Sequence, residues 1–433
     1  MKDFAASEDP AVQAQLDRLA ALTLPQGRLG LDVIRDLLAR VGNPQLHLPP
    51  VFHVAGTNGK GSTCAYLRAM LEAQGLTVHT ATKPHLVRYN ERIRVAGQLI
   101  SDSMLADLLR EVLDIGEDMG PSFFEVTTVA TLLAFARVPA DACVIEVGLG
   151  GRFDATNVMD RPAACGIATL GIDHEAFLLV PEEGVPTEPI VRIAFEKAGI
   201  ARAGSPLVTQ NYASHVEAEI ARIAALAGAP LQMRGQAWHA DVSDSGIAYR
   251  DHQGELALPL PALPGRHQGD NAALAVAMLR HQDSVTVSPE AMAEGIRAAR
   301  WPARMQLLAD GPLTAHAPGR DVWLDGGHNA DAGLALGRHF ANVDKVHVII
   351  GMLANRYPDA ILAPLQDKTA SVTAVPIDGS DSHGADAYAG RAQWAPDVAS
   401  ALRALPDDGA PVLIAGSLYL AGKVLAANNE VPD

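Results

Sequence analysis

The segment Val51–Ser62 joins a short apolar run to a glycine-rich turn that carries a lysine and a hydroxyl group. Its glycines let backbone N–H groups converge on an anion, because glycine adopts positive φ without a steric penalty. A helix starting near Ser62 would aim its positive dipole end at the same point. Lys60 would supply a point charge for the β- and γ-phosphates, and Ser62 a hydroxyl for Mg²⁺. The segment therefore predicts that the chain handles a nucleoside triphosphate.

The turn departs from the common P-loop pattern at two positions. Val54 stands where that pattern has its first glycine, and Gly61 follows the lysine where Ser or Thr is usual. The alternative interpretation is a tight strand-to-helix turn without a ligand. We favour the phosphate site because a lysine inside a glycine run serves no packing purpose.

Glu146 places a carboxylate near the end of the apolar run 142–147. A lone buried charge is costly, so this carboxylate needs a partner. In P-loop enzymes an acid at a strand end holds Mg²⁺ beside the phosphates. An ion pair with Arg152 is the alternative. The metal role is favoured, because the glycines that follow Glu146 leave open space beside the site.

Further groups that could do chemistry stand at expected strand ends or at a hinge. Asp173–His174 and Asp325–Asn329 each follow an expected strand. Arg304 lies in a plausible hinge, where it could close on a γ-phosphate or form a surface salt bridge. Lys197 ends a helix, and the plain interpretation is a solvated lysine that interacts favourably with the helix dipole.

Helix and strand signals alternate along the chain, which predicts an α/β fold with mostly parallel sheets. We expect a P-loop-type ATP-binding domain over residues 1–300, a hinge at 301–310 and a smaller Rossmann-like domain at 311–433. Residues 232–260 are interpreted as an excursion with short β-like runs. The expected strands are 51–55, 142–147, 166–172, 322–324, 346–350, 371–377 and 411–415, and 126–135 is an expected helix.

The composition narrows the class of protein. The 433 residues carry a formal net charge of -16, which argues against non-specific binding to nucleic acid or to a membrane surface. No apolar run approaches the roughly eighteen residues of a membrane span. The three cysteines lie far apart and resemble small buried hydrophobes. We therefore expect a cytoplasmic protein, in which any acidic substrate is held by a local cluster of cations.

From about residue 29 to residue 425 the chain resembles the folylpolyglutamate synthase/dihydrofolate synthase family of the Mur ligase superfamily. The most diagnostic stretch is 146–157, Glu-Val-Gly-Leu-Gly-Gly-Arg-Phe-Asp-Ala-Thr-Asn. The other motifs occur in the family order, at 56–62, 84–93, 124–127, 173–174, 196–200, 271–273, 304 and 325–329.

The resemblance implies a role for each matched residue. ATP would be contacted by Gly56, Thr57, Asn58, Gly59, Lys60, Gly61, Ser62, Asn271, Arg304 and Asp325, with His328 close to it. Ser62, Glu146 and His174 would bind one or two Mg²⁺ ions, and Lys197 would be carbamylated. The pterin site would be lined by Arg28, Leu29, Gly30, Ser122, Phe123, Phe124, Glu125, Phe153, Asp154 and Ala155. Lys60, Lys197, Arg304 and His328 would form the catalytic group.

The activity that the resemblance implies is that of an ATP-dependent amide ligase. It would join L-glutamate to dihydropteroate, and to the glutamate tail of reduced folates, through an acyl phosphate. The site must then neutralise charge and keep water out, which closure of two domains would provide. The expected partners are these small molecules, and the chain is expected to act as a monomer.

Two departures from the family pattern keep alternatives open. Lys83 stands before Pro-His-Leu, where the family usually has a serine that binds Mg²⁺. The segment between His174 and Lys197 is longer than usual, with residues 181–186 inserted. These features are the support for a weakened nucleotide-binding homologue with a regulatory role. A Mur-type ligase for another carboxylate is the second alternative, and the motifs at 124–127 and 146–157 weigh against it.

Overall fold

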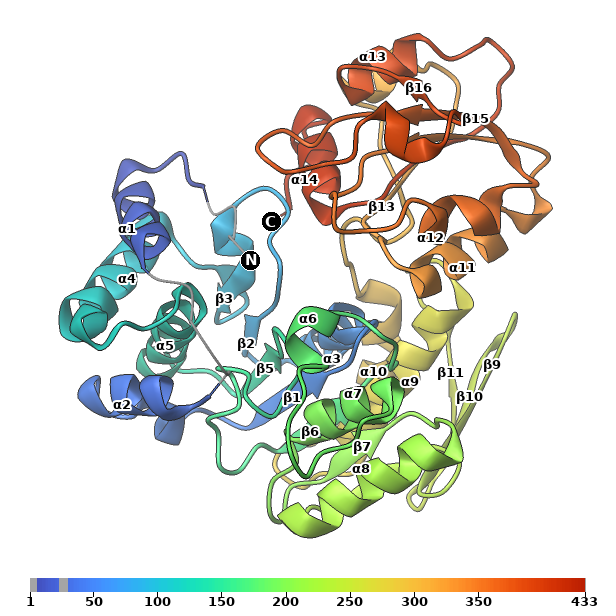
Figure 1. The fold of residues 1–433 in the computed structure, drawn as a ribbon. Coiled ribbons are helices and arrows are strands. Elements are labelled where there is room, and N and C mark those ends of the chain that lie inside the picture. The colour runs from blue at the N-terminus through green and yellow to red at the C-terminus, as the bar shows by residue number, and fades with distance from the viewer. Residues whose placement is uncertain (1–5, 23–29, 433) are drawn as a thin grey trace. The chain divides into compact units, whose positions relative to one another are not determined.

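The computed structural model describes residues 6–22 and 30–432 of the chain. These residues form two compact units, drawn as ribbons in Figure 1. Unit 1 comprises the residues up to 83, together with 89–262 and 266–300, and unit 2 comprises 84–88, 263–265 and the residues from 301 onward. Each unit contains a mostly parallel sheet with helices, so the expected α/β class is confirmed. The domain boundaries and the hinge at 301–310 stay a prediction.

The sheet of unit 1 has eight strands in the order β4-β3-β2-β5-β1-β6-β7-β8. The strands from β2 to β8 in this order run parallel, and β3 and β4 run antiparallel at one edge. β1 lies between β5 and β6 with all its residues buried, which explains its apolar sequence. The strands are β1 Val51–Ala55, β2 Val78–Ala81, β3 Ile93–Val95, β4 Gln98–Leu99, β5 Ala142–Glu146, β6 Ala164–Ile167, β7 Leu207–Thr209 and β8 Leu231–Met233.

Helices pack on both faces of this sheet. Cys143 and Ile145 of β5 share a core with the helices α4 and α5. On the opposite face Gly166 has no side chain, and Met278 of α9 fills that space. The helices of unit 1 are α1 Pro10–Ala21, α2 Asp32–Arg40, α3 Lys60–Ala73, α4 Asp102–Gly116, α5 Phe123–Arg137, α6 Glu175–Leu178, α7 Pro189–Ala198, α8 Ser214–Ala227, α9 Arg266–Arg280 and α10 Pro289–Ala298.

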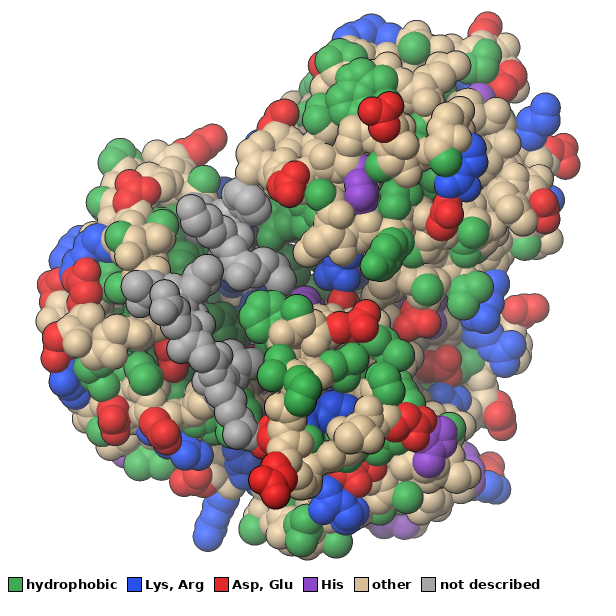
Figure 2. All heavy atoms as spheres, in the orientation of Figure 1, with side chains coloured by type: hydrophobic (Ala, Val, Ile, Leu, Met, Phe, Trp, Pro, Cys, Tyr) green, Lys and Arg blue, Asp and Glu red, His purple; other side chains and the backbone are tan. Residues whose placement is uncertain are grey.

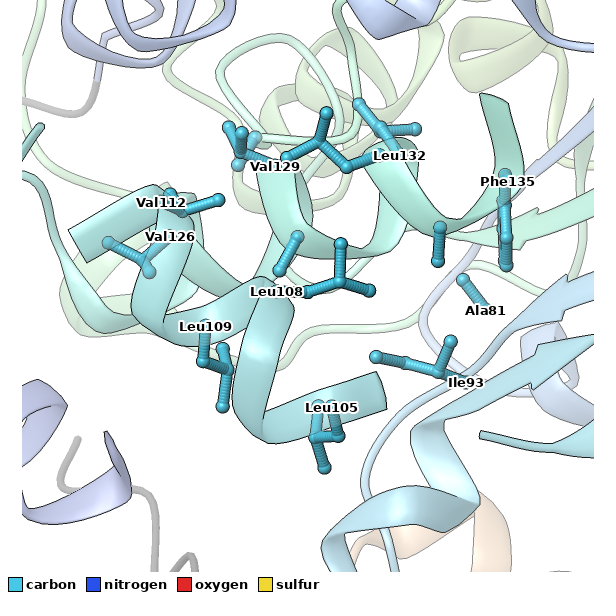
Figure 3. Close-up of a cluster of buried hydrophobic side chains, with 14 of the residues drawn as sticks. Ala81, Ile93, Leu105, Leu108, Leu109, Val112, Val126, Val129, Leu132 and Phe135 are labelled. Carbon is cyan, nitrogen blue, oxygen red and sulfur yellow. The ribbon is translucent and has the colours of Figure 1, made fainter. Parts of the chain in front are cut away.

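Figure 3 shows the core that α4 and α5 build against β2 and β3. Leu108, Val129 and Leu132 pack in the same cluster as Ala81 and Ile93, and all of them are buried. Each large apolar side chain buried in this way contributes about 1.5–3 kcal/mol. This core fixes the start of α5, where one predicted substrate segment lies.

A separate antiparallel sheet interrupts unit 1 before α9. It consists of β9 Trp238–Ser243, β10 Gly246–Asp251 and β11 Gly254–Leu258, in the order β11-β10-β9. Its alternating burial pattern is that of a sheet with one face against the core. The expected β-like excursion at 232–260 is confirmed.

Unit 2 contains a six-stranded sheet in the order β12-β13-β17-β14-β15-β16, parallel except for β12. Successive side chains of a strand point to opposite faces of the sheet, so the central strands contribute to two apolar clusters. Ile414 of the strand at 412–415 belongs to one cluster and Leu413 to the other. The elements are β12 Gln306–Leu307, β13 Val322–Asp325, α11 Ala330–His339, β14 Val346–Ile350, α12 Asp359–Leu362, β15 Thr369–Ala374, β16 Gln393–Trp394, α13 Val398–Arg403, β17 Val412–Ala415 and α14 Leu418–Ala427.

Several predicted boundaries were wrong. α3 begins at Lys60, close to its predicted start near Ser62, whereas β6 ends at Ile167 rather than at 172. α5 begins at Phe123, because Ser122 and Glu125 cap its first turn reciprocally. β15 covers 369–374 rather than 371–377.

Acidic and basic side chains are interspersed over the face drawn in Figure 2. Within residues 6–22 and 30–432, none of the helices combines the length and the apolar character that crossing a bilayer demands.

Candidate active site

The glycine turn links the buried end of β1 to the first residue of α3. At Gly56 φ is +152°, and a Cβ there would lie 2.9 Å from the Cβ of Ala168. At Gly59 φ is +83°, and a Cβ would collide with the side-chain amide of Asn271 on α9. Glycine is therefore required at both positions. No side chain of the described residues caps the N-terminus of α3 at Lys60, so its first N–H groups can serve an anion.

The chain that follows β6 runs beside this turn. Thr57 donates its backbone N–H to the carbonyl of Thr169 at 2.8 Å and its hydroxyl to the carbonyl of Gly171 at 2.8 Å. This segment leads to His174, whose Nε2 lies 3.9 Å from a carboxylate oxygen of Asp173. His174 has φ +53°, a conformation that is uncommon for residues other than glycine and that clusters at functional sites.

Two lysines converge on the turn. Lys60 donates to the carbonyl of Gly56 at 3.0 Å, and Lys197 donates to the same oxygen at 2.9 Å. Lys197 is only 5% exposed, so the interpretation of a solvated lysine was wrong. Burial, and then the charge of Lys60, lower the pKa of Lys197 to about 7. A substantial fraction of this amine is therefore neutral near neutral pH.

The predicted metal ligands are a hydroxyl, a carboxylate and an imidazole of unit 1. Glu146 is buried at the end of β5, in register with Val54 of β1, and its Oε2 accepts the N–H of Lys83 at 3.0 Å. Ser62 is buried in the first turn of α3. With His174, these oxygen-rich donors suit Mg²⁺ or Mn²⁺, so the residues present fit the expected ion.

Arg152, the alternative partner for Glu146, pairs with other carboxylates instead. Its Nη2 lies 2.6 Å from Glu182 and 2.8 Å from Glu196. Arg192 contacts the same two carboxylates at 3.0 Å each. The inserted segment 181–186 is thus anchored through Glu182. Sequence reasoning missed this network, because its members pair across up to 44 residues of the chain.

A cavity of about 510 Å³ in unit 1 unites two predicted substrate segments. Gly30 and Phe153 both line it, whereas Arg28 and Leu29 lie outside the described residues. An aromatic wall and a polar rim suit a flat heterocycle with hydrogen-bonding edges. The charged residues of its lining are Asp32, Arg35, Arg152, Asp160 and Arg202.

The segment Ser122–Glu125 and the loop after β5 meet at Gly148. A Cβ there would lie 2.8 Å from the ring of Phe124 and 3.2 Å from a carboxylate oxygen of Asp154. Glu125 accepts the N–H and the hydroxyl of Ser122 at 2.8 and 2.7 Å, which fixes this end of α5. The Lys83 ammonium lies 3.5 Å from the centroid of the Phe124 ring. In the same segment, the Phe123 ring lies edge-on to Tyr89.

A buried hydrogen-bond chain holds Asp154, and sequence reasoning missed its origin. His53 Nε2 lies 2.8 Å from the hydroxyl of Thr156, which donates to Asp154. Leu149 donates its N–H to the second oxygen of Asp154 at 2.8 Å, and Ala155 is buried within this loop. Burial lowers the pKa of His53 to about 3, so the ring is neutral. A histidine inside an otherwise apolar strand was the available signal.

Unit 2 holds Arg304 in a strained segment. Ala303 and Met305, on either side of it, have φ of +55° and +44°. Asp325 supports this conformation, since its two carboxylate oxygens accept the N–H groups of Met305 at 2.8 Å and Gly327 at 2.7 Å. The structure therefore brings Arg304 and Asp325 together.

The turn after β13 completes this group. A Cβ at Gly326 would collide with the side chain of Leu418 and would lie 3.2 Å from a guanidinium nitrogen of Arg304, so glycine lets both side chains lie against the turn. His328 Nδ1 lies 3.1 Å from the carbonyl of Gly326, which orients the imidazole. The predicted site residues are thus carried in part by each unit.

Comparisons with known proteins find close relatives. The dihydrofolate synthase/folylpolyglutamate synthase of Escherichia coli K12 is 36% identical over 81% of this chain and 78% of its own. A structure of E. coli FolC in complex with DHPP and ADP is 31% identical, with a TM-score of 0.86 over 98% of both chains. The bifunctional folylpolyglutamate synthase/dihydrofolate synthase of Yersinia pestis, with AMPPNP and Mn, is 31% identical, with a TM-score of 0.83 over 96% of this chain and 97% of that one. No family model matches the chain.

A parallel α/β unit with this phosphate turn, followed by a second α/β unit, defines an ATP-dependent ligase. Within that class, the chain belongs to the folylpolyglutamate synthase/dihydrofolate synthase family.

Proposed function

We propose that this protein joins L-glutamate through an amide bond to dihydropteroate and to the glutamate tail of reduced folates, at the expense of ATP. The observation that carries the proposal is the glycine turn, on which Lys60 and Lys197 converge at the carbonyl of Gly56. Membership of the family, and the DHPP and ADP bound to E. coli FolC, support these substrates.

The chemistry must activate a carboxylate, which is a poor electrophile. The γ-phosphoryl group passes from ATP to a carboxylate oxygen of the acceptor, which releases ADP and forms an acyl phosphate. The glutamate amine then attacks the acyl carbon, the bond to phosphate breaks, and the amine loses a proton. Charge on the transferred group must be neutralised, and water must be excluded to prevent hydrolysis.

The turn and its neighbours bind the triphosphate. The N–H groups of residues 56–62 face the phosphates, Lys60 neutralises the β- and γ-groups, and Asn271 contacts the nucleotide from α9. Ser62, Glu146 and His174 hold one or two Mg²⁺ ions. When bound, Mg²⁺ neutralises the charge that develops on the phosphates.

Lys197 is proposed to act as a carbamate. Its neutral amine attacks CO₂, a nitrogen–carbon bond forms and a proton is released, leaving an anionic oxygen ligand suited to Mg²⁺. The lowered pKa of Lys197 supports this reaction near neutral pH. The measurement is ¹³C NMR of protein in ¹³C-bicarbonate, and a carbamate signal that persists in Lys197→Met would disprove the assignment.

Arg304 and the 325–328 turn serve the same nucleotide. Arg304 stabilises the γ-phosphoryl group during transfer, Asp325 contacts ATP, and His328 lies close to it. The Asp325 hydrogen bond to Met305, beside Arg304, supports a shared role for these residues.

The acceptor occupies the cavity lined by Gly30 and Phe153. The segments Arg28–Gly30, Ser122–Glu125 and Phe153–Ala155 contact its pterin ring. The aromatic and charged lining supports the assignment of Gly30 and Phe153, whereas Ser122–Glu125, Asp154 and Ala155 do not line this cavity.

We assign the ATP-binding domain to residues 1–300, the hinge to 301–310 and the C-terminal domain to 311–433. The left-handed conformations of Ala303 and Met305 support a special backbone role for the hinge. The protein is proposed to act as a cytoplasmic monomer on small molecules.

The direct test measures ADP release from ATP, Mg²⁺ and L-glutamate with either acceptor added. Dihydropteroate or a reduced folate should stimulate release, and the glutamylated product should appear by mass spectrometry. ATP binding without stimulation by either acceptor would favour the weakened homologue, and stimulation by another carboxylate alone would favour a different ligase.

A further inference from the structure

A cluster of potential metal ligands lies where the antiparallel sheet of unit 1 meets the end of α9. Asp251 is the last residue of β10, His252 lies in the β10–β11 turn, and His281 directly follows α9. One ligand atom from each residue lies within 4.8 Å of the other two. None of these residues belongs to the nucleotide turn, and the function proposed above makes no use of them.

His281 provides a second observation that points to a ligand. Its side chain is only 4% exposed, and its Nε2 has no hydrogen-bond partner among the described residues. That nitrogen lies 3.7 Å from Asp251, and the His281 ring lies 5.0 Å from the ring of His252. A buried polar atom without a partner is costly. A cation held between these side chains would satisfy it.

Asp251 is already oriented as a ligand would be. Its side chain is fully buried, and it accepts hydrogen bonds from Arg280 at 2.6 and 2.7 Å and from the Tyr249 hydroxyl at 3.0 Å. The backbone N–H of Gln253 donates to the same carboxylate at 2.9 Å. The carboxylate is therefore paired with Arg280 and held by outer partners, as ligating carboxylates in metal sites are.

We propose that Asp251, His252 and His281 bind a divalent transition metal ion, and that Zn²⁺ is the best match. Two imidazoles and one carboxylate form a ligand set that zinc accepts, with water in the fourth position. Tetrahedral zinc with bonds of about 2.0–2.1 Å sets its ligand atoms roughly 3.4 Å apart. His252 is exposed in its turn, so it can close the remaining gap.

The electrostatic setting is mixed. The negative end of the α9 dipole lies beside His281 and favours a cation, whereas Arg280 opposes one. A neutral imidazole is the form that binds a metal, and the buried Nε2 of His281, which has no hydrogen-bond partner among the described residues, suits that form. The ion would fasten the hairpin sheet to α9, the helix that carries Asn271.

The test is a zinc titration of the full-length, metal-stripped and nucleotide-free protein, followed by competition with a chromophoric chelator. The wild type should bind zinc here, and His252→Ala or His281→Ala should lower that affinity by more than about tenfold. Zinc should also raise the unfolding temperature of the wild type and not of the variants. The matched control is His239→Ala, on β9 but outside the cluster, which should bind like the wild type.

The proposal is overturned if the wild type binds no zinc, or if both variants keep the wild-type affinity. Zinc that also occupies the nucleotide site would be removed by His174→Ala and not by His252→Ala, so the two sites are distinguishable. Because His252 is exposed, His252→Ala keeps the test valid if His281→Ala does not fold. If the wild-type protein binds zinc at this site but shows no ligase activity, the proposed function is refuted and the zinc site stands.

Discussion

Lys197 and His53 are buried bases, and each makes the stability of the protein depend on pH in a definite direction. Lys197 donates a hydrogen bond to the carbonyl of Gly56, and His53 Nε2 forms a hydrogen bond with the hydroxyl of Thr156. Burial is the main cause of both lowered pKa values. Neither contact could be found from local sequence, since the bonded residues are 141 and 103 positions apart.

Lys197 should destabilise the protein at low pH. Its pKa is about 7 in the folded protein, against an ordinary lysine value of 10.5, so between these values the unfolded chain binds more protons. The free energy of unfolding therefore rises with pH in this window. Relative to Lys197→Met, the wild type should gain about 2–3 kcal/mol from pH ~7 to pH ~9.

Urea unfolding in CO₂-free buffer measures this difference. Bicarbonate should alter the wild-type result and not that of Lys197→Met, because only the wild type can form the carbamate. A constant difference between wild type and variant across this pH range would contradict the buried, uncharged lysine.

His53 should make the protein less stable at acidic pH. Its pKa is about 3 in the folded protein, against an ordinary histidine value of 6.5, so below pH 6.5 the unfolded chain binds the additional proton. Stability is therefore lost as the pH falls. Relative to His53→Gln, which keeps a hydrogen-bonding side chain for Thr156, the wild type should lose about 2 kcal/mol between pH ~6.5 and pH ~5.

The measurement is urea unfolding of both proteins at the two pH values. His215→Gln, at an exposed histidine, should follow the wild type and serves as the control. If His53→Gln follows it too, the ring is not held neutral.

The glycine loop after β5 packs closely against the end of α7. A Cβ at Gly199 would lie 2.5 Å from the Cβ of Arg152 and 2.6 Å from its Cα. Gly199 has an ordinary helical φ of −61°, so this closeness, rather than backbone strain, requires the glycine. The contact positions Lys197, which lies two residues earlier.

Gly199→Ala should therefore destabilise unit 1 by about 1–3 kcal/mol, as overpacking does, and should lower kcat by displacing Lys197. Gly384→Ala is the control, because a Cβ there meets nothing of the described chain within 4 Å and its φ is −81°. Chemical unfolding and ADP release should separate the two variants. If Gly199→Ala and Gly384→Ala have equal stability and turnover, the loop accommodates the additional methyl group.

The elements that sequence predicted well are those with a local signal. The strand at 51–55 and the turn after it were evident from the sequence, because an apolar run interrupted only by His53 is followed by glycines. The end of β6 was missed, because residues 168–172 are still mostly apolar but turn along the glycine loop through Thr169. The start of α5 was missed, because its capping box, Ser122 with Glu125, lies before the apolar residues that signalled the helix.

Local sequence patterns predicted the class of fold in both units but not the environment of the site. Alternating helix and strand signals define parallel α/β units without reference to long-range contacts. The anchoring of the inserted segment through Glu182 and Arg192, and the strained backbone around Arg304, depend on the folded chain. A family motif therefore located Arg304 but not Glu182 or Arg192, and only the structure showed what surrounds each of them.

If the nucleotide contacts the groups carried by each unit, an ATP analogue with Mg²⁺ should slow amide hydrogen exchange at 56–62 and at 303–305 and 325–328. Ligand at about 100 times its Kd stabilises the binding-competent state by about 2.7 kcal/mol, and protection should appear in both segments at the same ligand concentration.

Variants then separate the contributions of the two units. Lys60→Ala should weaken protection everywhere, because the phosphates lose their main cation. Arg304→Ala should weaken protection at 325–328 while the glycine turn stays protected. Arg300→Ala is the matched control, because the Arg300 guanidinium donates only to carbonyls of its own segment among the described residues. Protection confined to 56–62 in the wild type would leave the phosphate turn intact but would remove Arg304, Asp325 and His328 from the proposed nucleotide site.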